Sequence, residues 1–563
     1  MALHKGLKAQ VLVNGFASTP FLTAQGLPQG DPLSPLLYNL VLEPFLCHLR
    51  ATISGLPLIG LPFICSAFAD DVAVGISSPQ DRKALITAIS LHEQACNAKL
   101  NITKSEFLPL SSDTLDTIPT IGLVLARDKP FKHLGITFHP QCFPLPQSYF
   151  DSLLNSLQST IANWQKRKLS LIGKVLILNS RLLSKLWYIS YHVSFPPYFF
   201  PRVNRLLTAF LWNGKRAQMS LDYFFTAAKQ GGMGLLNPAH HSQAIKAWWY
   251  TRIITPTPPP WQQLSLEVFK TRYAPSGWGL DILATSATQH KLRHKGIWAD
   301  MVQAWRALNG SFSEELDPLT YGETPPLTSS SLAGGTLEEY KINTGSSYLR
   351  TTLYPLLENH KWQQEDPNCA IDWTAIWEQL QNTRKHLPPQ QVVLWWRLLH
   401  HNIMTANRTA HFVPGASNLC RHCNSAVETP GHLFYSCHNI SPLWEFIFSI
   451  LTPFSSLALP PLSLSVILSP FSSFPPSLFP VLSVFFGYGF WSIWRSHWAL
   501  VFDYTQCSPA SLRAVFISQI FSHVTALAHI AHRKGDKPWK DFQGTWKPCS
   551  LFSISDDGKL CLT

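Results

Sequence analysis

The segment of residues 64–75 constrains the fold most, because it sets two neighbouring carboxylates between two apolar runs. It reads Ile-Cys-Ser-Ala-Phe-Ala-Asp-Asp-Val-Ala-Val-Gly. The runs predict two short strands folded back on each other, with Asp70 and Asp71 at the tip. Adjacent carboxylates repel, so a fold tolerates them at a buried tip mainly when a cation neutralises them. Such a pair suits Mg²⁺, which prefers hard oxygen ligands, and the two-metal chemistry of phosphoryl or nucleotidyl transfer.

A glycine- and proline-rich run lies upstream of the hairpin, at residues 25–35. It reads Gln-Gly-Leu-Pro-Gln-Gly-Asp-Pro-Leu-Ser-Pro. Ser34 and Pro35 suit a helix start, as an N-cap and a first-turn proline. Gly26 and Gly30 would let the backbone come close to a bound molecule where a Cβ would clash. Taken by itself, the run is also compatible with an ordinary turn before a helix.

In this order and at this spacing, the two segments resemble motifs B and C of the palm of a reverse transcriptase. The alanine in Phe68-Ala69-Asp70-Asp71 resembles the non-LTR (LINE-type) retrotransposon branch more than the retroviral one. The resemblance implies an RNA-directed DNA polymerase that uses nucleotides, an RNA template and a DNA primer or target, with magnesium at Asp70 and Asp71. It places template or substrate contacts in motif B, at Gln29, Gly30, Pro32 and Ser34.

Two later segments extend the resemblance. Residues 99–106 are similar to the family's motif D, which implies that Lys104 protonates or neutralises the leaving pyrophosphate. Taken alone, Lys104 would be an ordinary surface lysine. Residues 131–138 resemble motif E, the primer grip. Gly135 lies within its strand pattern, where glycine allows the close approach of another backbone, either the primer or a neighbouring strand.

Residues 148–192 predict helices, and residues 164–188 look like the family's thumb. Lys174, Arg181 and Lys185 lie at i, i+7 and i+11, which is one face of a regular helix. A basic stripe opposite an apolar stripe would let the helix dock on the palm and contact phosphates. A solvated basic face is the alternative.

A second cluster of chemically active residues follows a C-x2-C-x8-H-x4-C pattern: Cys420, Cys423, His432 and Cys437. This spacing can close a tetrahedral sulfur and nitrogen shell around zinc, and four protein ligands would make the zinc structural. The alternative is a chance cluster of buried cysteines. The region also resembles the zinc-binding module that follows the reverse transcriptase in many such retrotransposons, which implies a role in holding template RNA or target DNA.

The composition indicates a folded, basic protein. Of its 563 residues, 46% are apolar and only 14% are charged, which excludes a disordered chain. A net charge of +12 favours a polyanionic partner, and 20 Trp and 34 Phe favour nucleic acid over a basic surface kept for solubility. The 11 cysteines are scattered and odd in number, which favours a reducing compartment. The resemblance implies an intracellular ribonucleoprotein, in the cytoplasm or the nucleus.

No membrane segment is expected. The N-terminus lacks the continuous apolar region of a secretory signal. Residues 446–494 carry no charge, but prolines interrupt them repeatedly. The unbroken part, residues 481–494, is too short to span a bilayer. It predicts a buried helix that follows a loop.

Together these features predict an α+β chain: a partial polymerase palm with a β-hairpin, a helical thumb, and a mostly helical C-terminal half with a small zinc module. Residues 9–24 add two strands around an Asn-Gly turn. Residues 230–235, Gln-Gly-Gly-Met-Gly-Leu, predict a turn. The expected parts are residues 1–143 (palm), 144–235 (thumb and connector), 236–405 (helical, with a flexible stretch at 310–347), 406–446 (zinc module) and 447–563 (C-terminal helices).

One element of the family pattern is missing from the sequence. In the family, the fingers and motif A, which carries a third catalytic aspartate, precede motif B. No Asp or Glu occurs before Asp31, and Asp31 itself belongs to motif B. We therefore expect a truncated chain with exposed apolar palm surface and an incomplete magnesium site, inactive as a polymerase alone. A catalytically dead nucleic-acid-binding remnant, using the thumb and zinc module, and a non-functional relic stay open as alternatives.

Overall fold

The computed structural model describes fifteen stretches of the chain: residues 8–22, 27–28, 30–58, 61–108, 124–125, 131–138, 145–253, 263, 265, 296–308, 346, 350, 352–454, 459–555 and 559–562. The proposed flexible stretch at 310–347 lies almost wholly outside them. By its contacts the chain forms two compact units. Unit 1 comprises Met1–Phe150, Trp249–Val302 and Ser311–Ser330; unit 2 comprises Asp151–Trp248, Gln303–Gly310 and Ser331–Thr563.

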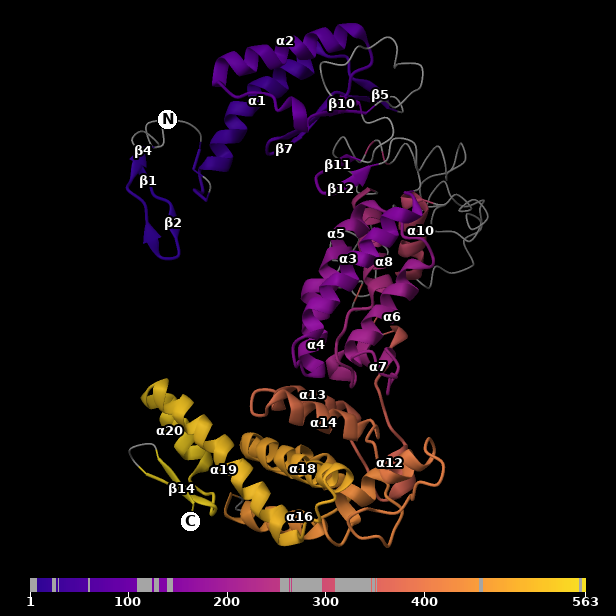
Figure 1. Ribbon diagram of the computed structural model, residues 1–563, viewed down its shortest axis with the longest axis vertical. Helices are drawn as coiled ribbons and strands as arrows, with labels where there is room; N and C mark the ends of the chain where they lie inside the picture. Colours follow the sequence, from indigo (N-terminus) through magenta and orange to yellow (C-terminus); the bar gives the residue numbers. More distant parts are fainter. Residues whose placement is uncertain are drawn as a thin grey trace, which may run out of the picture. The chain divides into compact units, whose positions relative to one another are not determined.

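The N-terminal part of unit 1 combines two helices with short paired strands (Figure 1). The helices are α1 (Ser34–Thr52) and α2 (Pro79–Cys96). The antiparallel pairs are β1 (Lys8–Ala9) with β4 (Phe21–Leu22), β2 (Leu12–Val13) with β3 (Phe16–Ala17), β5 (Leu56–Leu58) with β6 (Leu61–Phe63), β7 (Cys65–Phe68) with β8 (Asp71–Val74), and β11 (Phe131–His133) with β12 (Ile136–Phe138). Strands β9 (Glu106–Phe107) and β10 (Val124–Leu125) pair in parallel.

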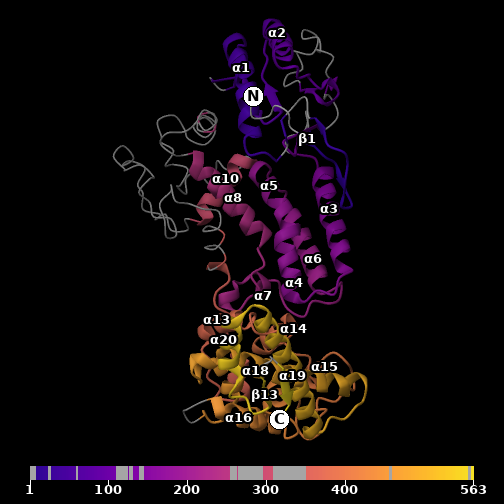
Figure 2. The same ribbon diagram turned by 90° about the vertical axis from the view of Figure 1, so that its left-hand side faces the viewer.

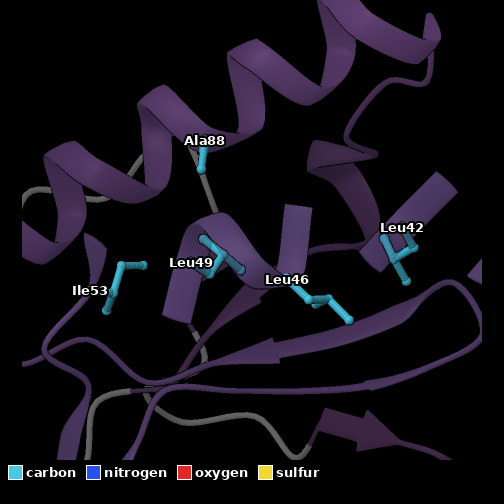
Figure 3. Packing of buried hydrophobic residues seen from close by; sticks show 5 residues of the cluster. All are labelled: Leu42, Leu46, Leu49, Ile53 and Ala88. Carbon is cyan, nitrogen blue, oxygen red and sulfur yellow. The ribbon is translucent and has the colours of Figure 1, made fainter. Parts of the chain in front are cut away.

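The core of unit 1 lies between α1, α2 and the β7–β8 hairpin. Leu42, Leu46 and Leu49 repeat at helical spacing along α1, so they share one face, and Ile53 directly follows the helix. Figure 3 shows them directed between the hairpin and Ala88 of α2. Each fully buried leucine contributes about 1.5–3 kcal/mol. This packing fixes the hairpin on the helix that follows the glycine- and proline-rich run.

Unit 1 also exposes apolar surface, as expected for the palm. Leu12, Phe16 and Phe68 are largely solvent-exposed. Within the described residues, β7 and β8 pair only with each other, so each has an unpaired outer edge. The predicted turn near residue 14 is present, since Asn14 and Gly15 both have positive φ between β2 and β3.

The first part of unit 2 is a helical bundle. It contains most of α3 (Gln147–Gln165), then α4 (Leu171–Ile177), a π-helical segment η4 (Leu178–Leu183), α5 (Ser184–His192), α6 (Phe199–Leu211), α7 (Asp222–Phe225) and η5 (Ala228–Gln230). Helices α8 (Pro238–Ile253) and α10 (Ile297–Leu308) follow in the chain. The predicted turn after η5 is confirmed: Gly231 and Gly234 have φ of +96° and +75°, which only glycine adopts readily.

The second part of unit 2 is also mostly helical. Helices α14, α18 and α19 pack in sequence against one another (Figure 2). The elements are α12 (Lys361–Glu365), α13 (Trp373–Thr383), α14 (Pro389–Leu399), α15 (Ala406–Ala410), η11 (His432–Ser436), α16 (Ser441–Leu451), η12 (Thr452–Phe454), α17 (Leu464–Leu468), η13 (Pro470–Ser472), η14 (Pro476–Leu478), α18 (Phe479–Phe502), α19 (Pro509–Arg533), α20 (Asp536–Trp546), β13 (Phe552–Ile554) and β14 (Leu560–Leu562).

Tryptophan builds the core of this part. Five indole rings are fully buried, and each ring N–H donates to a backbone carbonyl: Trp362 to Leu399, Trp377 to Leu357, Trp395 to Leu468, Trp396 to Gly231 and Trp444 to Phe434. A buried indole needs such a partner because its N–H otherwise remains unsatisfied. These five tryptophans are therefore structural and unavailable for stacking on nucleic-acid bases.

Two helices, within Pro476–Phe502 and Pro509–Arg533, are long and apolar enough to cross a bilayer. The first contains α18, which continues to Phe502, beyond the unbroken stretch that the sequence predicted. Residues 481–490 of α18 are all buried against the protein, as predicted for a core helix. Helix α19 packs on α18 and α20 through Leu512, Phe516, Ile520, Val524 and Ala528.

Candidate functional site

The paired aspartates lie at the tip of a tight hairpin, as predicted. In the register of β7 and β8, Phe68 is opposite Asp71, so Ala69 and Asp70 form a two-residue turn. Ala69 has φ of +51°. The hairpin packs on α1, which contacts β7. In this position, burial and then the charge of Asp70 raise the pKa of Tyr38. The structure therefore brings the helix of the glycine- and proline-rich run and the aspartates together.

The hairpin tip is not buried, which corrects the premise of a buried carboxylate pair. Both Asp70 and Asp71 are exposed. Solvent screens their repulsion, so this hairpin does not require a cation to fold. Within the described residues, neither aspartate belongs to a group of three or more metal-ligating side chains. The geometry presents two carboxylates to solvent without a third ligand.

The start of α1 differs from the predicted cap. Ser34 is the first helical residue, and Leu33 takes the N-cap position without a side-chain hydrogen bond. Asp31 does the capping, since its carboxylate accepts from Leu33 N and Ser34 Oγ, each at 3.3 Å. A carboxylate also suits the positive end of a helix. Ser34 is buried by this contact, whereas Pro32 is exposed in the turn.

The other motif B positions are partly described. Gly30 is exposed with φ of +93°, and nothing lies within 4 Å of a Cβ built there. Among the described residues, nothing packs closely on Gly30. Glycine is therefore favoured at this position by the backbone conformation. Gln29 and Gly26 lie outside the described residues.

The two later motifs lie on short elements. Lys104 ends a single 3-10 turn, Ile102–Lys104, and is exposed. Gly135 is not inside a strand, which corrects the prediction. Leu134 and Gly135, with φ of +48° and +77°, form the two-residue turn between β11 and β12. Positive φ at both positions defines a type I′ turn, which favours glycine at the second.

The predicted basic stripe on the thumb segment is wrong at Lys174. Its side chain is buried, with Nζ 2.7 Å from Leu211 O and 2.8 Å from Asn213 Oδ1. Burial lowers its pKa. The π-helical segment η4 explains the error: its wider turn changes the angular spacing between Lys174 and the residues that follow. Arg181 and Lys185 are exposed, and Lys185 Nζ donates to Thr160 Oγ1 at 2.9 Å.

The four residues of the cysteine and histidine pattern meet in space, as predicted. Their ligand atoms all lie within 4.8 Å of one another. Cys420 Sγ is 3.9 Å from Cys437 Sγ, and Cys423 Sγ is 3.3 Å from His432 Nε2. Ligands in a tetrahedral zinc shell lie about 3.5–3.8 Å apart. The donor set and its separations therefore fit zinc.

Local structure explains how the cysteines converge. Cys420 and Cys423 flank a turn closed by the Leu419–Val427 bridge, with Asn424 at φ of +56°. The hydrogen bond from Cys420 lowers the pKa of the Cys437 thiol and raises that of Cys420. A thiol that ionises readily is the better metal ligand.

Two glutamates, the buried Glu428 and the partly buried Glu365, hold the module in shape. The Glu428 carboxylate accepts from Ala406 N at 2.6 Å and Arg421 N at 3.0 Å. Glu365 accepts from Thr429 Oγ1 at 2.8 Å and Gly431 N at 2.7 Å, just before His432. Sequence reasoning missed Glu365, because no spacing pattern links α12 to the cysteines. Only the fold brings it there.

Comparisons with known proteins agree with this geometry. Residues 2–138 match the family "Reverse transcriptase (RNA-dependent DNA polymerase)", and residues 348–444 match "zinc-binding in reverse transcriptase". The Xenopus laevis "Transposon TX1 uncharacterized 149 kDa protein" is 28% identical over 239 residues, 42% of this chain and 18% of that protein.

Two further relatives are Pol polyproteins of retrotransposable elements. The "Retrovirus-related Pol polyprotein from type-1 retrotransposable element R2" of Popillia japonica is 26% identical over 32% of this chain and 30% of its own length. That from type-2 element R2DM of Drosophila melanogaster is 30% identical over 23% of this chain and 10% of its own length. The chain thus spans less than a third of each of these relatives. Over the matched residues, the chain is thus similar to the reverse transcriptases of non-LTR, LINE-type retrotransposons.

Proposed function

We propose that the chain supplies the aspartate hairpin and nucleic-acid-holding parts of an RNA-directed DNA polymerase, and that these 563 residues alone do not polymerise. The observation that carries the proposal is the exposed Asp70–Asp71 tip packed beside α1. Both carboxylates would coordinate Mg²⁺ at the growing DNA end. An RNA template and a DNA primer or target would be the partners.

The remaining motif residues take supporting roles in this proposal. Exposed Lys104 would reach the leaving pyrophosphate. Gln29, Gly30 and Pro32 would line the template path, while Ser34, bonded to Asp31, would fix the start of α1. Gly135 would shape the turn that approaches the primer.

Among the residues that the structure describes, no third carboxylate joins Asp70 and Asp71, which supports inactivity of the isolated chain. Two aspartates on one hairpin leave the clamp on the attacking and leaving oxygens incomplete, because two metal ions need ligands on both sides. Primer extension on an RNA template, with Mg²⁺ and all four nucleotides, tests this directly. We expect no product beyond that of Asp70→Asn. DNA synthesis by the unaltered chain that Asp70→Asn abolishes would contradict the inactivity.

We also propose that Cys420, Cys423, His432 and Cys437 hold a structural zinc ion. Metal analysis of purified protein should find about one zinc per chain. Cys437→Ser should lose it and lower the thermal midpoint, because metal binding contributes to folding. Cys561→Ser removes an exposed cysteine elsewhere and should keep the metal. Full metal content in Cys437→Ser would exclude this ligand set.

Exposed basic residues favour a second function, nucleic-acid binding without catalysis. Arg181 and Lys185 remain accessible, and Lys166, Arg167 and Lys168 are exposed after α3. Together with the zinc module they would hold RNA or DNA by its phosphates. Anisotropy measurements should show RNA binding that the double variant Arg181→Gln/Lys185→Gln weakens and Asp70→Asn leaves unchanged. Equal affinities of all three proteins would refute the thumb's role.

A further inference from the structure

A pair of arginines, one just before the zinc module and one at its start, is arranged around one buried side chain. Arg397 lies in the last turn of α14, and Arg408 lies in α15. Between them the chain reverses, and Asn402 is buried in the bend. Arg397 Nε donates to Asn402 O at 3.2 Å, and Arg408 Nη1 donates to Asn402 Oδ1 at 2.6 Å.

A loop from the first part of unit 2 completes the arrangement. Asn402 Nδ2 donates to Gln218 O at 3.0 Å, and Arg397 Nη2 donates to Gln218 Oε1. Every acceptor so far is a neutral amide oxygen. Within the described residues, neither guanidinium forms an ion pair with a carboxylate. The two cations are therefore held together without an anion.

Holding them together carries an electrostatic penalty. Burial lowers the pKa of Arg397 to about 10, and the charge of Arg408 lowers it as well. One guanidinium would be enough to crosslink the bend. A second cation beside it adds repulsion and is not needed for that structural role. An anion between or beside the two would offset both the burial and the repulsion.

Donor groups remain for such an anion. A guanidinium has five N–H groups. The bonds described use two on Arg397 and one on Arg408. Each side-chain nitrogen of Arg397 and Arg408 either has a hydrogen-bond partner or contacts solvent. The free N–H groups can thus meet a ligand from outside, and their planar fork matches a phosphate.

The surroundings favour nucleic acid as the source of that phosphate. Along the chain, no Asp or Glu occurs between Glu378 and Glu428. Among the described residues, the carboxylates that reach the bend, Glu365 at His401 and Glu428 at Ala406 N, pair with neither arginine. On the loop that carries Gln218, the guanidinium of Arg216 lies over the ring of Phe412, 5.6 Å from its centroid. Phe412 is 58% exposed. Positive charge beside an exposed aromatic ring is typical of single-strand binding, where bases stack and phosphates pair.

We infer that Arg397 and Arg408 form a phosphate-binding site for single-stranded nucleic acid, with Phe412 as a stacking surface for a base. The inference deepens the proposed function and rests on its nucleic-acid partner. It assigns the contact to the bend between α14 and α15, outside the thumb segment and outside the metal ligands. Asn402 positions both guanidinium groups.

The test measures binding of a fluorescein-labelled 20-nucleotide RNA to the full zinc-loaded chain over a salt series. Arg408→Gln should weaken binding about fivefold or more and lower the log–log salt slope by about 0.7, the loss of one single-strand phosphate contact. Arg408→Lys should restore part of both, because it keeps the charge but not the fork. Phe412→Ala should weaken binding with the salt slope unchanged.

The matched control is Lys547→Gln, which removes an exposed charge directly after α20. Zinc content and circular dichroism of Arg408→Gln should equal those of the unaltered chain. If Arg408→Gln and Lys547→Gln bind alike while the unaltered chain binds RNA, the site is overturned and the proposed function stands. If the unaltered chain binds no RNA, both are overturned. Polyglutamate is the last ligand tested. If Arg408→Gln weakens polyglutamate binding but not RNA binding, the site is assigned to an acidic protein and the inference is overturned.

Discussion

Ala69 carries backbone strain at the tip of the aspartate hairpin. Its φ of +51° lies in the left-handed region, which costs an L-residue with a Cβ about 1–2 kcal/mol. Ala69→Gly removes that clash but adds freedom to the unfolded chain, worth about 0.4–1 kcal/mol. We expect the free energy of unfolding to rise by up to about 1 kcal/mol in urea titrations.

Ala73→Gly is the matched control, because Ala73 lies inside β8 opposite Ser66. There glycine lowers the free energy of unfolding by about 0.5–1 kcal/mol. A loss of stability in both variants would show that the turn at Ala69 is not strained.

His400 makes the stability of unit 2 depend on pH. Its ring stacks on Trp377 with centroids 4.8 Å apart, and Nε2 donates to Gly231 O at 2.7 Å. Burial lowers its pKa to about 4. Between about pH 4 and the ordinary imidazole value near 6.5, the unfolded chain binds more protons than the folded one. The free energy of unfolding therefore falls as the pH is lowered through this range.

For His400 alone the fall should approach about 3 kcal/mol. Thermal midpoints at a series of pH values measure it. His400→Gln should show a shallower fall than the unaltered chain, while His411→Gln, at an exposed position, should show the same fall. Parallel curves for His400→Gln and the unaltered chain would show that another group titrates.

At the scale of single elements, short-range patterns were the reliable ones. Sequence alone could predict three features that neighbouring residues determine. They are the hairpin at residues 64–75, the Asn14-Gly15 turn and the cysteine and histidine cluster at residues 420–437. Predictions that assumed regular geometry failed. The sequence predicts Gly135 inside a strand, because a two-residue turn through Leu134 has no glycine at its first position. It predicts Ser34 as the cap, because the reach of Asp31 depends on the folded turn.

The thumb segment shows the same limit at helix length. A stripe drawn over Lys174, Arg181 and Lys185 holds only while every turn has 3.6 residues. The π-helical segment η4 breaks that period, and no residue pattern in the sequence predicts a π-helical segment there. Contacts between residues far apart in the sequence, such as Glu365 with Thr429, could not be predicted from the sequence either.

Buried Lys174 gives the prediction for this element. Lys174→Met keeps the apolar stem but leaves Leu211 O and Asn213 Oδ1 without their donor. The free energy of unfolding should fall by about 1–3 kcal/mol. RNA affinity measured well below the thermal midpoint should not change. Weaker RNA binding with unchanged stability would show that Lys174 contacts RNA and has no structural role.

At the scale of the whole molecule, the net charge of +12 predicts strong salt dependence of nucleic-acid binding. A complex with four single-strand phosphate contacts should lose roughly fifty-fold in affinity between about 50 and 200 mM salt. A fluorescence anisotropy series over that range measures the slope. A flat salt dependence would mean that base stacking, and not the basic surface, holds the strand.

The tryptophan core has a practical consequence for such titrations. Five indoles are sealed from water and tied to carbonyl oxygens, so their emission should be blue-shifted and indifferent to a ligand that binds on the surface. A red shift on heating or in denaturant would then report loss of the interior itself. Their part of the intrinsic fluorescence thus reports the integrity of each variant, beside the emission of exposed tryptophans such as Trp498.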